Sequence, residues 1–164
     1  MFKYKINYII YMKKKVNIKL LLICLFIVYF IAFIGSLFTS NAVKSDWYQQ
    51  NKPSLTPPSY VFPIVWNVLF FLIAYSLYFT WTKAKQKNLV IIFYGINFVL
   101  NASWSYFYFY LKNPLFSFIE LIFLWMSILS LLIFTYKIDK KASYLLIPYF
   151  LWVSFAGILN YLTI

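Results

Sequence analysis

Long windows without charge alternate with short lysine-containing segments along this chain of 164 residues. The windows cover residues 20–43, 53–82, 88–111, 113–136 and 142–164, and only Glu120 interrupts them. Each exceeds the roughly 20 mainly apolar residues that a bilayer-spanning helix needs. The pattern predicts an all-α integral membrane protein, a five-transmembrane-helix bundle over residues 20–164, preceded by a basic segment at residues 1–19. The connections are short except at residues 40–60.

Composition favours the same class, because 64% of the residues are hydrophobic and 25% are aromatic. A soluble domain of this length could not bury so much apolar surface. The first window could instead belong to a cleaved signal peptide, but residues 20–39 exceed the usual apolar core of about 7–15 residues, which favours a retained span. Both Met1 and Met12 are compatible with the start of the protein, since MKKKVNIKLLL reads like an ordinary beginning.

The lysines predict an orientation. Twelve lie in residues 1–19, 83–87 and 137–141, and three lie in the connections on the other side of the membrane. The positive-inside rule then places the N-terminus in the cytoplasm and the C-terminus outside, which requires an odd number of spans. The absence of arginine is typical of an AT-rich genome and favours a bacterial plasma membrane. Because the bases are divided among short flanks, no nucleic-acid partner is expected.

Several kinds of chemistry are excluded by residues that are missing or isolated. The chain has one cysteine, Cys24, and no histidine, so no internal disulfide and no metal site built on His or Cys clusters is expected. The three acidic residues are scattered along the sequence, and no hydrolytic constellation is present. Any reaction would therefore depend largely on a bound ligand.

The prolines concentrate before the second span. Pro53, Pro57, Pro58 and Pro63 fall within eleven residues, where a missing N–H does little harm to the helix that follows. Because proline-fixed backbone loses little entropy on ordering, this segment can form a rigid cover over the outer end of the bundle. Pro148, about two turns into the fifth span, should bend that helix or open its first turns.

Polar and aromatic side chains recur at helical spacing on single faces of the spans. If these faces converge, they enclose an aromatic cavity suited to a flat apolar ligand. For Asn101 the residues favour a ligand contact and an interhelical hydrogen bond equally, whereas Asn97 and Asn160 favour the hydrogen bond. The faces comprise Trp66, Phe70, Ile73 and Leu77; Asn97, Asn101, Trp104 and Tyr108; Ser117, Glu120, Leu124 and Ser127; and Trp152, Ala156 and Asn160.

Four stretches resemble the TspO/MBR family, which comprises the tryptophan-rich sensory proteins and the translocator (peripheral benzodiazepine receptor) proteins. They are GSLFT (35–39), the segment from Trp47 through KPS and PP to Trp66, LNASWS (100–105) and PYFLWVSFAGILN (148–160), in order and with consistent spacing from about residue 20. The resemblance implies a five-helix bundle, often dimeric, that binds porphyrins and other hydrophobic ligands beneath the first loop. The candidate ligand-binding residues are Trp47, Pro53, Pro57, Pro58, Tyr60, Trp66, Asn101, Trp104, Glu120, Trp152 and Ala156.

This sequence departs from the family pattern at several of those positions. Leu55 and Tyr60 stand where many members have tryptophan, Ile64 replaces a frequent proline, and Glu120 stands where aspartate is common. Fewer loop tryptophans weaken the expectation of strong ring stacking. The animal-type sterol motif is absent from the C-terminus, where no basic residue follows Tyr161.

The leading interpretation is a membrane receptor or sensor that binds porphyrin or haem as a ligand and requires no cofactor. The alternative suggested by the resemblance is an enzyme for light- and oxygen-dependent porphyrin degradation, in which Trp66 or Trp152 would relay a radical. A porphyrin or lipid transporter ranks lower, because the sequence shows no inverted repeat and no coupling-ion site. A homodimer is expected, with Gly95 and Ala102 as a possible seam.

Overall fold

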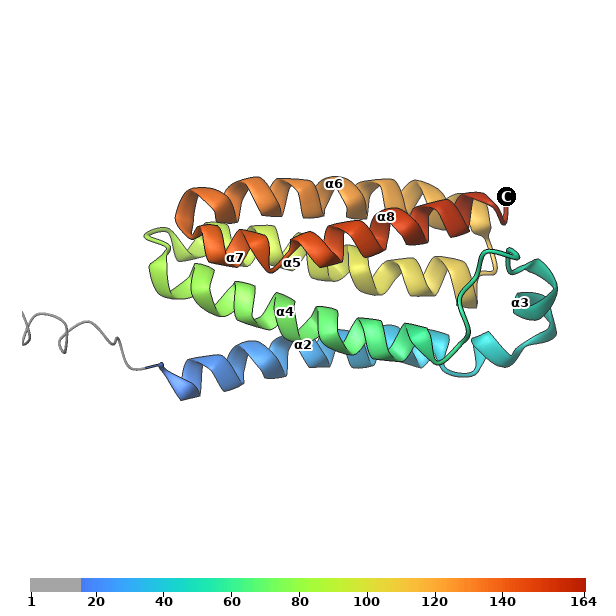
Figure 1. Cartoon of the computed structure of the whole chain (residues 1–164), viewed down its shortest axis with the longest axis horizontal. Coiled ribbons are helices and arrows are strands. Elements are labelled where there is room, and N and C mark those ends of the chain that lie inside the picture. The colour runs from blue at the N-terminus through green and yellow to red at the C-terminus, as the bar shows by residue number, and fades with distance from the viewer. Residues whose placement is uncertain (1–15) are drawn as a thin grey trace, which may run out of the picture.

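The computed structural model describes residues 16–164, so the question of the starting methionine and most of the basic segment 1–19 lie outside it. The described chain is helical and contains no strand (Figure 1). Its elements are α2 (Ile18–Thr39), η1 (Ala42–Lys44), α3 (Asp46–Asn51), α4 (Val61–Lys83), α5 (Lys87–Ser105), the π-helical turn η2 (Tyr106–Tyr110), α6 (Pro114–Ile138), α7 (Lys140–Tyr144) and α8 (Ile147–Tyr161).

Five helical segments of the described chain are long and apolar enough to cross a membrane, which confirms the predicted fold class. They run alternately up and down, with α7 and α8 together forming the fifth (Figure 1). We call the end that carries η1, α3 and residues 52–60 the loop end; the C-terminus lies there too. We call the opposite end, with the α4–α5 and α6–α7 connections, the lysine end.

Side-chain caps mark where several helices begin. Asn17 accepts a hydrogen bond from the Leu20 amide at the start of α2, and Asn113 accepts one from the Phe116 amide at the start of α6. Each satisfies an amide that has no partner inside its helix. Pro114 occupies the first turn of α6, where its missing N–H costs nothing. These local signals fix the ends of the spans.

Buried hydroxyl and amide groups connect the helices across the apolar core. The Tyr94 hydroxyl of α5 lies 2.7 Å from Ser76 Oγ and 3.2 Å from Thr80 Oγ1, both on α4. Asn97 Nδ2 donates to Ser127 Oγ of α6 at 2.9 Å, so Asn97 makes the interhelical hydrogen bond that the sequence favoured. Because lipid offers no partners to these groups, each bond is retained only when the helices keep their mutual positions.

The fifth span is interrupted at residues 145–146, directly before Pro148, as predicted. The Leu146 amide bonds to the Ser143 carbonyl instead of continuing the helical pattern to Ala142. The Ala142 carbonyl instead accepts a hydrogen bond from Ser76 Oγ of α4 at 2.7 Å. The break in one helix is thus satisfied by a hydroxyl from its neighbour.

The segment at residues 40–60 is more helical than expected. The sequence suggested a connection stiffened only by prolines, but η1 and α3 occupy its first half. Ser45 caps α3 by accepting a hydrogen bond from the Tyr48 amide, and Asp46 follows in the first turn. This Ser-Asp pair is a recognised helix-start signal that the proline-centred interpretation passed over.

Replacing Asp139 with alanine should lower the free energy of unfolding by about 1–2 kcal/mol. Asp139 Oδ1 caps α7 through the Lys141 amide, and its Oδ2 lies 2.8 Å from Lys83 Nζ in an ion pair that lacks hydrogen-bond alignment. Asp139→Asn should keep the cap and cost less, because the Lys83 side chain is 53% exposed and the pair is screened. Thermal unfolding in detergent measures both variants. Equal losses in the two would show that the cap contributes nothing.

Candidate functional site

A cavity of about 390 Å³ lies at the loop end of the bundle. Side chains from α2, α4, α5, η2, α6 and α8 line it, and residues of α3 and of the proline-containing segment close its end. No charged residue is among those that line it within the described chain. Its volume falls in the range of roughly 300–1,000 Å³ that is usual for pockets that bind small molecules.

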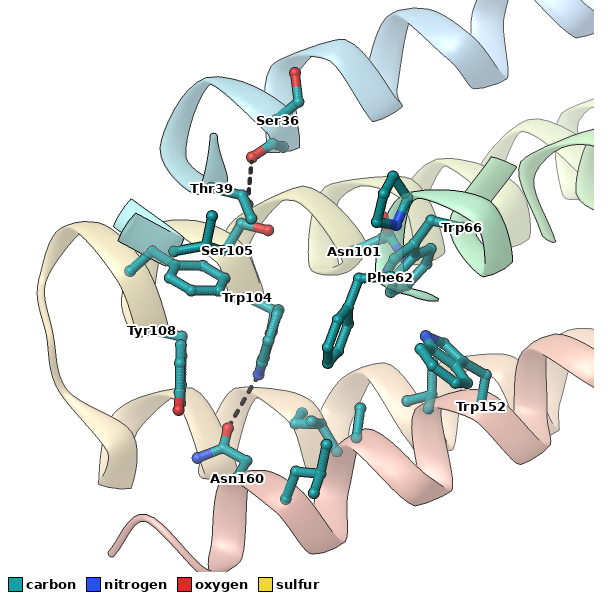
Figure 2. A pocket seen from close by; sticks show the side chains of 18 of the residues that line it. Ser36, Thr39, Phe62, Trp66, Asn101, Trp104, Ser105, Tyr108, Trp152 and Asn160 are labelled. Carbon is teal, nitrogen blue, oxygen red and sulfur yellow. Dashed lines mark hydrogen bonds between the residues drawn. The ribbon is translucent and has the colours of Figure 1, made fainter. Parts of the chain in front are cut away.

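Three tryptophans from three different helices face this space: Trp66 of α4, Trp104 of α5 and Trp152 of α8 (Figure 2). Phe62 projects between Trp104 and Trp152 and contacts the latter edge-on, with ring centroids 5.9 Å apart. Trp66 stacks on Phe70 at 5.2 Å. Ring faces and edges therefore form a large part of the apolar wall, beside aliphatic residues such as Leu121 and Val153.

The indole nitrogens of these tryptophans differ in their hydrogen bonding. Trp104 Nε1 donates to Asn160 Oδ1 at 3.0 Å, as the dashed line in Figure 2 shows. Within residues 16–164, neither Trp66 nor Trp152 donates its indole N–H to a protein acceptor in this way. Two donors in an apolar cavity are consequently available to a guest molecule.

The two asparagines of the cavity are used differently. Asn160 is 2% exposed and makes three contacts: it accepts from Trp104 and from Ser117 Oγ, and its Nδ2 donates to the Pro114 carbonyl at 2.9 Å. Asn101 Nδ2 donates to the Tyr149 hydroxyl at 2.9 Å. No described residue donates to Asn101 Oδ1, so Asn101 combines an interhelical bond with a free acceptor at the cavity.

Tyr48 and Pro53 close the cavity at the loop end. Tyr48, in α3, is 8% exposed and packs against Phe109 with ring centroids 5.7 Å apart. Burial, with a smaller contribution from nearby Tyr108, raises the pKa of the Tyr48 hydroxyl above its usual range. A tyrosine hydroxyl is already protonated near neutral pH, and this shift extends its range as a donor to more alkaline conditions.

The structure brings six of the eleven candidate ligand-binding residues to the cavity. A further five do not line it. The lining residues are Pro53, Trp66, Asn101, Trp104, Trp152 and Ala156, and the others are Trp47, Pro57, Pro58, Tyr60 and Glu120.

Two of the residues outside the cavity have structural contacts instead. Trp47 packs edge-on against Tyr108 at 5.7 Å, behind the cavity wall. Glu120 is buried and accepts a hydrogen bond from Ser103 Oγ at 2.9 Å. Its other oxygen, Oε2, has no partner among the described residues.

Sequence reasoning missed the contribution of the first span. Four residues of α2 line the cavity: Ala32, Gly35, Ser36 and Thr39. Their side chains are small, so they leave unfilled space between α2 and the neighbouring helices. The run of small and hydroxyl residues near the end of an otherwise bulky span was the available signal. Phe62 was also missed, because it lies in the proline-containing segment, which was interpreted only as a rigid cover. Its ring projects into the cavity.

Comparison with known proteins agrees with this architecture. A profile of the TspO/MBR family matches residues 22–163. The "Tryptophan-rich protein TspO" of Chlorobaculum tepidum is 34% identical over 146 residues, covering 86% of this chain and 91% of the relative. Its namesake in Archaeoglobus fulgidus is also 34% identical, covering 88% and 95%. The human "Translocator protein" is 28% identical and covers 79% of each chain. With the matched region spanning all five helices, this chain belongs to the TspO/MBR family of integral membrane proteins.

Proposed function

We propose that this protein is a membrane receptor that binds a porphyrin, or a similarly flat hydrophobic molecule, in the cavity at the loop end. Family membership supports a membrane sensor or transporter role. The observation that carries the finer proposal is the cavity wall itself, where Trp66 and Trp152 present ring surface together with uncommitted indole N–H groups. Ring faces stack a macrocycle, and the N–H groups can donate to its acceptor atoms.

The charge distribution suggests how such a ligand would be oriented. The cavity has no charged lining residue in the described chain, so the macrocycle belongs inside and its carboxylates belong at the loop end. Lys52 directly precedes the cavity residue Pro53, and its Nζ lies at the exposed surface 2.6 Å from Gln49 Oε1. A carboxylate at that edge can replace the glutamine as its partner.

Titration with protoporphyrin in detergent or nanodiscs tests the proposal. We expect saturable tryptophan quenching at one ligand per chain, and affinity about two- to tenfold weaker in Trp66→Phe or Trp152→Phe, because each keeps a ring but loses area and an N–H. Trp81→Phe, a matched change that does not touch the cavity, should bind like the unmodified protein. Quenching that never saturates, or that is equal in all these proteins, would refute the cavity as the binding site.

Porphyrin photodegradation is the second candidate function. It is favoured by the position of Trp66 and Trp152, two oxidisable rings, on the wall of one cavity. A photoexcited porphyrin held there would contact both rings while oxygen acts as the oxidant. Illumination of the complex in air distinguishes this function from simple binding: an enzyme gives a new chromophore over several turnovers, and a receptor gives none.

Several expectations from the sequence stay predictions. They are the homodimer, a lipid ligand or transport, the bacterial plasma membrane, and the orientation with a cytoplasmic N-terminus. For the predicted seam on α5, no atom of a neighbouring element among residues 16–164 lies within 4 Å of the position where a Cβ on Gly95 would stand.

A further inference from the structure

A groove between α2 and α4 adjoins the cavity from the side of the bundle. It is lined by Tyr29, Ala32, Phe33, Ser36, Pro63, Trp66, Asn67 and Phe70. Five of these eight residues also line the cavity, and only Tyr29, Phe33 and Asn67 belong to the groove alone. The shared wall shows that the two hollows meet along the seam of these helices, with Trp66 at their junction.

The outer side of this groove is apolar and unprotected by other helices. Phe33 is 58% exposed on α2, and on α4 Ile64 and Val68 are 60% and 54% exposed. In a protein whose helices span a membrane, such surfaces face the lipid tails. The groove therefore leads from the cavity towards hydrocarbon rather than towards water.

A single polar pair crosses the groove on this lipid-facing side. The Tyr29 hydroxyl donates to Asn67 Oδ1 at 2.9 Å and also lies 3.3 Å from the Asn67 carbonyl oxygen. Both residues are exposed on the lipid-facing surface. Without the Tyr29 hydroxyl, the side-chain amide of Asn67 would face lipid with no hydrogen-bond partner. The bond joins α2 to α4 beside the opening, at a position where an apolar residue would be the ordinary choice.

The alternative way into the cavity, through the loop end, is more thoroughly packed. Tyr48, Tyr108 and Phe109 are 5–8% exposed and form a buried cluster there, against which Trp47 and Trp104 pack. Opening that end would separate the rings of this cluster. At the groove, the contacts of Tyr29 across the α2–α4 seam are its hydrogen bond to Asn67 and a tilted ring contact with Phe70, with centroids 6.4 Å apart. Opening the seam at this point therefore separates one such pair of rings rather than a buried cluster.

We propose that the groove is a side opening through which an apolar molecule dissolved in the bilayer exchanges with the cavity, and that the Tyr29–Asn67 hydrogen bond is its latch. The inference rests on the proposed function for the identity of the guest, but the opening itself does not depend on it. Hydrogen bonds between membrane helices change equilibria by about threefold on average and about twentyfold at most, so this latch opens readily.

Exchange kinetics of protoporphyrin in nanodiscs test the latch. Tyr29→Phe and Asn67→Leu remove the hydrogen bond but keep bulk, and neither residue lines the cavity. Association and dissociation rates should both rise about threefold, with the equilibrium constant within twofold of the original. The double variant should match the single ones, because all three lack the same bond. Val68→Ala, the neighbouring exposed position, is the control, and unchanged rates in both latch variants would overturn the proposal.

Access from the bilayer can be measured without any porphyrin. In lipids brominated along the acyl chain, the fluorescence of Trp66 should be quenched, and that of Trp104, which lines only the cavity, should not. The fluorescence of each tryptophan is obtained by subtracting the emission of Trp66→Phe or Trp104→Phe from that of the unmodified protein. Equal quenching of the two rings overturns the side opening. Quenched Trp66 with no saturable porphyrin binding would instead refute the proposed function and leave the opening in place for another bilayer-dissolved guest.

Discussion

Trp152→Ala should weaken protoporphyrin binding about 30-fold, a loss of about 2 kcal/mol. Trp152 lines the cavity from α8, contacts Phe62, and has no acceptor for its indole N–H among the described residues. Truncation removes a large ring surface and a donor together, whereas phenylalanine at the same position keeps most of the surface. Fluorescence or absorbance titration in nanodiscs gives the dissociation constants.

Trp81→Ala is the matched control for this loss. Trp81 lies at the lysine end of α4, where Lys87 Nζ sits 5.4 Å from its ring centroid and hydrogen-bonds to its carbonyl. This position agrees with the interfacial role that the neighbouring Lys83 suggests for it. A comparable loss of affinity in Trp81→Ala would mean that porphyrin reports general adsorption to tryptophan rather than occupation of the cavity.

Asn160→Leu should destabilise the bundle by about 2 kcal/mol, because it removes three hydrogen bonds worth about 0.6 kcal/mol each and leaves the Trp104 N–H without its acceptor. The three bonds tie α8 to Trp104 of α5 and to Ser117 and Pro114 of α6. For a chain of this length the loss corresponds to a fall of about 4–8 °C in Tm. Thermal unfolding in detergent, followed by circular dichroism, measures it.

Asn88→Leu provides the comparison for this stability loss. Asn88 is exposed in the first turn of α5 and makes no side-chain hydrogen bond in the described chain. The same amide-to-aliphatic change should therefore alter Tm little. If Asn160→Leu unfolds at the same temperature as Asn88→Leu, the contacts of Asn160 are replaced by other partners, and the asparagine does not hold the three helices together.

The fold was accessible from the sequence because the bilayer imposes a simple rule. A span needs a long apolar window, and lysines mark the gaps between windows, so the five spans could be predicted without reference to packing. The break before Pro148 followed from the geometry of proline alone. The interhelical role of Asn97 followed from the scarcity of partners in lipid.

The site was harder to predict from the sequence than the fold. Helical spacing shows which residues share a face of one helix, but it does not show how closely another helix packs against that face. Trp66, Trp104 and Trp152 could be chosen for their rings on shared faces. Trp47 and Glu120 belonged to equally plausible positions, yet the former packs behind the cavity and the latter bonds to Ser103. The small residues of α2 are hard to recognise as site residues from the sequence. They contribute by leaving part of the cavity unfilled rather than by offering a group that contacts the ligand.

The hydrogen bond from the Ser76 hydroxyl to the Ala142 carbonyl influences the position of the cavity wall at the other end of the bundle. This hydrogen bond fixes the register of α4 against a carbonyl that the interruption of the fifth span leaves without its helical donor. A slip of α4 by one residue would turn that helix by about 100°. Trp66, ten residues away and thus about 15 Å along the axis, would then swing off the cavity wall. The break in the fifth span at the lysine end therefore helps to hold Trp66 on the cavity wall at the loop end.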